Sequence, residues 1–173
     1  ESLILSKEYY KAMSTITYFD TECYVNKIGY LVWFQVMTEG VYKPIELINE
    51  LLRKDDIEDI LNLFDTQNSL VLKHTLFDCF FVWFLSSYGL EKEALTVIST
   101  IKDHCNRENT DLSAVNTFAG KVLPHLLNGM YHLGKGDLET ASTLIAKEKD
   151  VFDCVSGSEE QRMILSLIAS RKK

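Results

Sequence analysis

The chain holds four histidines and four cysteines, the side chains most often used as metal ligands and nucleophiles. His125 and His132 are seven residues apart on an expected helix, so about 10 Å of helix rise separates them, too much for binding one metal ion directly. His104 and Cys105 are adjacent, but neighbours in sequence are not thereby aligned as base and nucleophile, and no oxyanion site is identifiable. The sequence therefore predicts no metal site and no catalytic cysteine.

Acidic residues cluster where a helix is expected to begin, at Asp55, Asp56, Glu58 and Asp59. Such a cluster could pair carboxylates for acid–base catalysis, but at a helix start we expect these side chains to complement the helix dipole and to face water. The glycines at 134 and 136 flank a lysine without the preceding strand or the ending of a phosphate-binding loop. We therefore predict no catalytic residues, no cofactor and no enzymatic activity. An enzyme with a helical fold is the alternative, and it would bring ionisable side chains together in a pocket.

Aromatic side chains are numerous, with nine Phe, eight Tyr and two Trp. Tyr18 and Phe19 fall at an expected turn and Tyr42 lies in the loop before Pro44, where exposed aromatic rings would serve as partner-binding anchors. The alternative is that these rings fold back over the core. Five further aromatics lie too densely on one expected helix to share one face, which favours a helix enclosed all round: Phe77, Phe80, Phe81, Trp83 and Phe84.

Composition limits the classes of partner. The formal net charge is −7 and the pI is about 5.1, which opposes binding to nucleic acid because phosphate neutralisation needs clustered Lys and Arg. The cysteines lie far apart without a CxxC pair, so we expect reduced, mostly buried thiols and a cytoplasmic protein. The most hydrophobic run, residues 76–85, is well short of the roughly 20 residues that a membrane span needs.

Length favours one domain over residues 1–173, and the first and last residues suggest a piece excised from a longer chain. Only two prolines and eight glycines interrupt it, which favours helices. Asp55 or Asp56 is expected to cap one helix and Asp137 another, while Pro124 predicts a kink or a restart. Hydrophobic spacing predicts about nine helices and no strand, with apolar stripes at about 2–17, 21–38, 45–52, 57–64, 69–88, 94–101, 115–133, 138–145 and 164–168.

A turn recurs along the chain. Gly89 precedes Ala94 by five residues, as Gly136 precedes Ala141, and looser versions place the matching positions at 12 and 60. The interval from 60 to 94 equals the 34 residues of a tetratricopeptide unit, whereas the other intervals are longer. The pattern resembles degenerate tetratricopeptide repeats, which implies an all-α, right-handed α-solenoid of antiparallel helix pairs. An irregular helical bundle is the alternative.

A narrower resemblance covers most of the chain. The order of the helix pairs, with segments at 122–126, 136–141, 159–162 and 164–165, resembles the cytosolic domain of tail-anchored peroxisomal proteins that recruit an AAA ATPase export complex. In that family a helical domain binds the ATPase complex and a C-terminal span holds it at the peroxisomal membrane. The resemblance therefore implies an adaptor at the cytosolic face of that membrane, anchored through a segment outside this chain.

The function predicted from the residues is a non-enzymatic adaptor that binds another protein, with acidic residues favouring a basic partner surface. A scaffold subunit of another trafficking, mitochondrial or chromosome-associated complex is the alternative within binding proteins. A helical-repeat RNA-binding protein of the pentatricopeptide kind would need regular 35-residue units and a basic groove, which the sequence lacks.

Overall fold

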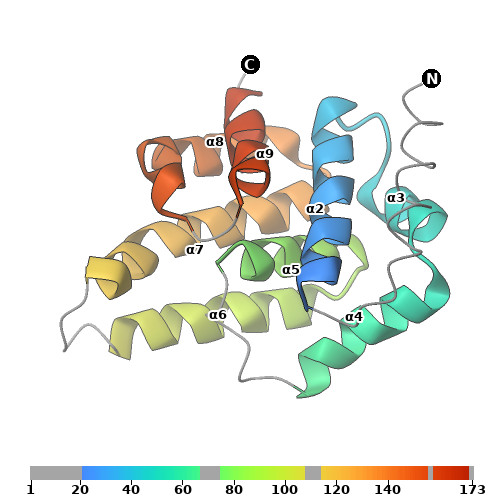
Figure 1. The fold of residues 1–173 in the computed structure, drawn as a ribbon, viewed down its shortest axis with the longest axis horizontal. Coiled ribbons are helices and arrows are strands. Elements are labelled where there is room, and N and C mark those ends of the chain that lie inside the picture. The colour runs from blue at the N-terminus through green and yellow to red at the C-terminus, as the bar shows by residue number, and fades with distance from the viewer. Residues whose placement is uncertain (1–20, 67–74, 108–113, 156–157, 172–173) are drawn as a thin grey trace.

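The computed structural model describes residues 21–66, 75–107, 114–155 and 158–171. These residues form α-helices and one 3₁₀-helix, without a strand, so the predicted all-α class is confirmed (Figure 1). The helix predicted over residues 2–17 lies outside the described residues. The elements are α2 (Thr21–Met37), α3 (Pro44–Leu51), α4 (Lys54–Thr66), α5 (Thr75–Ser87), α6 (Glu91–Arg107), α7 (Ala114–Gly134), α8 (Leu138–Ile145), the 3₁₀-helix η2 (Ala146–Cys154) and α9 (Glu159–Ser170).

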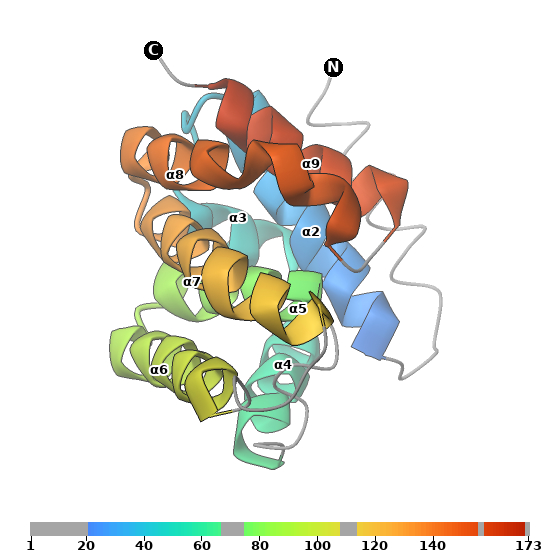
Figure 2. The same cartoon turned by 90° about the vertical axis from the view of Figure 1, so that its left-hand side faces the viewer.

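Helix α5 is the centre of the core. It contacts α2, α6 and α7, and it lies above α6 in both views of the molecule (Figures 1 and 2). Trp83, Phe80 and Phe84 are fully buried, and Phe77 and Phe81 are nearly so. The prediction that this aromatic helix is enclosed all round is therefore confirmed.

A buried hydrogen-bond network joins α2, α5 and α7 at their C-terminal ends. The indole Nε1 of Trp83 donates to Oε1 of Gln35 at 2.8 Å, and Nε2 of Gln35 donates to the carbonyl of Leu133 at 2.9 Å. Gly134 brings α7 against α5 at the same place, because a Cβ there would lie 2.6 Å from the carbonyl oxygen of Trp83. The three helices thus end side by side.

The structure contains the repeated turn at both Gly89 and Gly136. Gly89 and Gly136 have φ values of 85° and 83°, a left-handed conformation that favours glycine. In each turn the glycine amide donates to the carbonyl three residues earlier, and the next amide donates to the carbonyl five residues earlier. Ala94 and Ala141 are fully buried. The two turns therefore have the same hydrogen bonds and the same packing of the alanine.

Of three local expectations, one needs correction, one is decided only for the restart of a helix, and one is confirmed. Helix α4 begins at Lys54, so Asp55 and Asp56 lie inside its first turn rather than at its cap. Helix α7 continues through Pro124, so the chain does not restart there. Asp137 does cap α8, since its carboxylate accepts a hydrogen bond from the amide of Thr140 at 3.0 Å.

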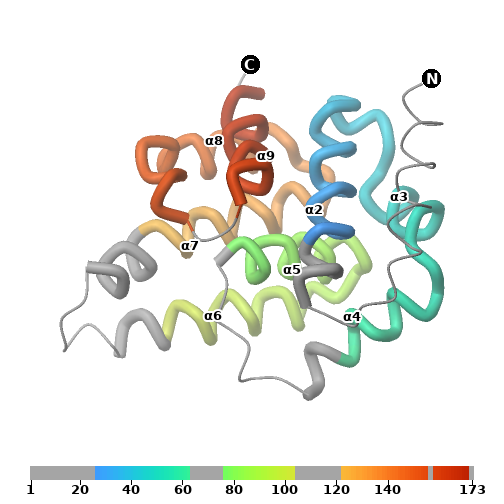
Figure 3. Tube along the Cα trace, viewed as in Figure 1, coloured from blue at the N-terminus to red at the C-terminus, as the bar shows by residue number. Residues whose placement is uncertain are grey.

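The first and last described helices meet. Helix α9 contacts α2 as well as α8, and the tube view places α2 and α9 next to one another (Figure 3). Two polar contacts join them: Gln161 Nε2 donates to Asn26 Oδ1 at 2.9 Å, and Arg171 Nη1 pairs with Glu39 Oε1 at 2.8 Å. Elements far apart in the sequence therefore share one surface.

Candidate protein-binding groove

A groove of about 900 Å³ runs between α2 and α9. Its apolar lining includes Tyr30, Trp33 and Met37 from α2 and Met163 and Leu167 from α9. Grooves of this size, mainly apolar with a few polar groups, are typical binding sites for ligands and peptide segments. The groove is therefore the candidate functional site.

Helix α2 supplies one wall because it is apolar on more than one face. Ile28, Leu31 and Val32 are fully buried, whereas the side chains of Trp33 and Met37 are 37% and 45% exposed. Trp33 and Met37 are four residues apart, so they lie on the same face of the helix. Residues of α2 therefore serve both the core and the groove.

Aromatic packing steadies this wall. The ring centroids of Tyr30 and Trp33 lie 5.6 Å apart with their planes tilted by 30°. Such aromatic pairs add stabilisation beyond that of buried area. The indole is thus held in place while part of its surface faces the groove.

Helix α9 supplies the other wall. Ile164 and Ile168 point into the core, whereas the side chain of Met163 is 62% exposed. Ser158 starts the helix with a capping box, since its hydroxyl accepts from the amide of Gln161 and the Gln161 side chain accepts from the amide of Ser158. The cap fixes the first turn of α9 at one end of the groove.

The charge of the groove is negative. Glu160, in the first turn of α9, is the one carboxylate among the described lining residues, which include no Lys or Arg. A hydrogen bond with Ser158 and a backbone amide lower the pKa of Glu160 below its ordinary value. Glu160 is therefore ionised at neutral pH.

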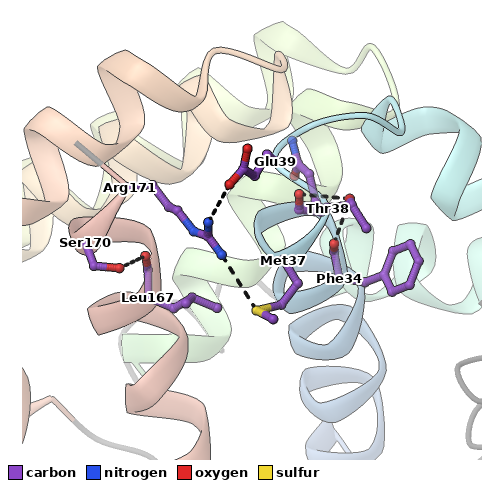
Figure 4. A network of polar contacts seen from close by, with 8 residues as sticks. Phe34, Met37, Thr38, Glu39, Leu167, Ser170 and Arg171 are labelled. Carbon is purple, nitrogen blue, oxygen red and sulfur yellow. Dashed lines mark hydrogen bonds and ion pairs between the residues drawn. The ribbon is translucent and has the colours of Figure 1, made fainter. Parts of the chain in front are cut away.

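An ion pair lies beside Met37, at the other end of the groove. Arg171 reaches from the end of α9 to Glu39, and its Nη2 lies 3.9 Å from the sulfur of Met37 (Figure 4). Between Asn26 and Met37 the rise of α2 is about 16 Å, or three turns. The two polar contacts between the helices thus bracket an apolar stretch about three helical turns long.

Of the aromatic anchors predicted from the sequence, Tyr42 is the one among the described residues, and it is not in the described lining of this groove. Tyr18 and Phe19 lie outside the described residues. Tyr42 is half-buried, with its ring centroid 5.7 Å from that of Phe34, so it packs back against the core. It borders a separate hollow of about 430 Å³ beside Lys43.

Trp33, Met37 and Met163 were not among the binding residues predicted from the sequence. The signal that was present is a second apolar spacing on each helix. Trp33 and Met37 are four residues apart and partly exposed, and the exposed Met163 precedes Leu167 by four residues. Nothing in that spacing says that the two stripes face one another.

The described histidines and cysteines, which could bind a metal or act in catalysis, do not lie together. The described residues contain no cluster of three or more metal-ligating side chains. His125 pairs with Glu148, and His132 lies 3.5 Å from Asp137, so each histidine contacts its own carboxylate. Cys79 is buried, which raises the pKa of its thiol, whereas Cys154 is exposed, so the expectation of mostly buried thiols stays a prediction. The side chains of His104 and Cys105 lie outside the described residues.

Asp56 differs from the other acidic residues at the start of α4. Its side chain is 4% exposed and pairs with Lys27 Nζ at 2.9 Å, with Arg53 on its other side at 3.1 Å. Burial raises its pKa, but hydrogen bonds from Arg53 and Lys27 outweigh that effect and lower the pKa to about 2. The expectation that this cluster faces water is therefore wrong for Asp56, which links α4 to α2.

No described helix is both long and apolar enough to cross a membrane. Comparison with known proteins adds no relative, since no family model, curated protein or solved structure matches the chain.

Proposed function

We propose that the chain is a non-enzymatic adaptor that binds another protein through the groove between α2 and α9. One observation carries the proposal: three of the six large apolar side chains exposed in the described residues, Trp33, Met37 and Met163, line this single groove. Clustered apolar side chains on a surface mark interaction sites, whereas scattered ones do not. Trp and Met are also enriched at protein interfaces.

The finer architecture belongs to the same proposal. We propose that α5 with α6, and α7 with α8, are tetratricopeptide-like helix pairs of a right-handed α-solenoid. The equivalent turns at Gly89 and Gly136 support this pairing. Solenoids of this kind serve mainly as binding surfaces, which agrees with an adaptor.

The sharpest form of the adaptor proposal is a recruiter of an AAA ATPase complex at the cytosolic face of the peroxisomal membrane. Its support is the resemblance in the order of the helices and in the segments at 122–126, 136–141 and 159–165. A scaffold subunit of another trafficking, mitochondrial or chromosome-associated complex would use the same groove and is examined by the same test. Partner contacts by Tyr18, Phe19 and Tyr42 remain predictions.

The test compares two variants as bait in an affinity capture from lysate, with the captured proteins quantified by mass spectrometry. Met163→Glu places a charge in the groove, and Leu95→Glu places the same charge at an exposed apolar position of α6, 49% exposed and outside the groove. We expect Met163→Glu to lose a partner set that the wild type and Leu95→Glu both retain. Equal capture by all three baits would refute a role for the groove, and an AAA ATPase in the lost set would support the recruiter.

A further inference from the structure

Helices α2 and α9 run in the same direction along the groove. Asn26 contacts Gln161 near the start of α9, and Glu39 contacts Arg171 at its end. The C-terminal ends of both helices, with their partial negative charge, therefore lie at the end where Arg171 pairs with Glu39.

The fold contains a second pair of helices that run in the same direction, α5 and α7, and a third helix packs on both of them. The C-terminal ends of α5 and α7 meet at Gly134, and these two helices pack together. Helix α6 contacts both of them and begins at that same end, where Glu91 pairs with Lys135 just beyond α7. It therefore runs opposite to α7, and it buries a stripe spaced i, i+3, i+4 and i+7: Ala94, Val97, Ile98 and Ile101.

We propose that the groove binds an amphipathic helix of a partner protein that runs opposite to α2 and α9, with basic residues in its last turn facing Glu160. The inference rests on the proposed function and deepens it by naming the chemistry of the partner. The helix lies on α2 and α9 as α6 lies on α5 and α7. About three turns fill the apolar stretch, with anchors at the same i, i+3, i+4 and i+7 spacing.

Charge complementarity sets the direction. The C-terminal turn of a helix carries partial negative charge and favours Lys or Arg. In the proposed orientation that turn lies over Glu160 and near the exposed Glu159, in a groove whose described lining holds no cation. Helix α6 likewise has two acidic residues, Glu91 and Glu93, in its first turn.

The experiment uses two synthetic peptides of about 18 residues without Trp, each with a leucine stripe at the helical spacing. One has three Glu in its first turn and three Lys in its last, and the other has these charges exchanged. Binding is followed by emission and acrylamide quenching of Trp33, since the other of the two tryptophans, Trp83, is fully buried. We expect the peptide with C-terminal lysines to bind about fivefold more tightly, the upper range for an exposed ion pair.

Part of the difference in affinity arises in the peptides themselves, because their charges also interact with the dipole of the peptide helix and so change its stability. That part is the same for every protein variant. Glu160→Lys is expected to abolish the remaining preference, and Glu159→Lys, outside the lining, to reduce it less. A preference unchanged by Glu160→Lys would overturn the proposed orientation.

Three further outcomes overturn the proposal. Binding that survives Met163→Glu would place the peptide elsewhere. Failure of both peptides, with capture from lysate still dependent on Met163, would reject a helical basic partner while leaving the proposed function intact. The third kind of outcome would identify another occupant of the groove. If the protein forms a dimer that Met163→Glu dissociates, the occupant is a second copy of the chain. If deleting residues 1–20 raises the affinity for the peptide more than about tenfold, the occupant is the chain's own N-terminal segment.

Discussion

Replacing Asp56 by Asn tests whether a buried ion pair fixes the helix that carries one wall of the groove. Lys27, next to the groove residue Asn26, is as buried as Asp56, with 4% of each side chain exposed. Removing one partner of a buried pair leaves the other charge without its compensation, which typically costs about 3–5 kcal/mol. We expect Asp56→Asn to lower the free energy of unfolding at pH 7 by an amount in that range.

The pH dependence follows from the lowered pKa. Asp56 has a pKa of about 2 in the folded chain against 3.8 ordinarily, so its ionisation stabilises the fold above pH 3.8. That stabilisation, about 2 kcal/mol for the shift, is lost as the pH falls toward 2 because the carboxylate must then be protonated. The stability difference between wild type and Asp56→Asn should therefore be about 1 kcal/mol smaller at pH 3 than at pH 7.

The assay is urea denaturation of both proteins at the two pH values. Asp55→Asn is the matched control, because Asp55 is the exposed neighbour in the same helical turn, and its replacement should change stability by less than about 0.5 kcal/mol. The double variant Lys27→Met with Asp56→Leu should recover most of the loss, since a buried pair replaced by apolar side chains is often neutral. An Asp56→Asn loss equal to that of Asp55→Asn, with no pH dependence, would refute the reasoning.

Three further substitutions test the packing, each by the midpoint of urea denaturation. Gly134→Ala should destabilise by about 1–3 kcal/mol, because its Cβ would lie 2.6 Å from the carbonyl of Trp83, and a loss below about 0.5 kcal/mol would contradict that close approach. Gln35→Leu should cost about 2 kcal/mol by leaving the buried Trp83 indole without its acceptor, and an unchanged midpoint would argue against the network. Gly89→Ala should cost about 1 kcal/mol because of its φ of 85°, although nothing lies within 4 Å of the added methyl group.

The helices were predictable wherever one face alone is buried. Val97, Ile98 and Ile101 are at helical spacing and all are buried, so periodicity located both the helix and its inner face. The paired turns were predictable because glycine at 89 and 136 meets a local need for positive φ. Asp56 was not predictable from its neighbours, because its burial depends on Lys27, 29 residues earlier in the chain.

The groove could not be predicted from the sequence either, because its two walls come from helices that are far apart in the chain. Its two walls are joined by residues 135 apart, and local periodicity contains no information about which distant stripe a helix will face. Exposed aromatics were sought in loops, where Tyr42 instead packs on Phe34, while the exposed indole lies in the middle of a helix. Whether a side chain is exposed depends on which distant elements pack over it, and the local sequence does not show that.

Contact between the first and last described helices also has a consequence for binding in the groove. An open array of helix pairs presents a long concave surface to its partner, and each pair contacts only its neighbours. Here α9 packs on α2, α2 also packs on α5, and α9 also packs on α8 and η2, so the groove exists only when these described elements are assembled. Binding in the groove must therefore stabilise the whole fold, because a ligand that binds only the folded state shifts the unfolding equilibrium toward it.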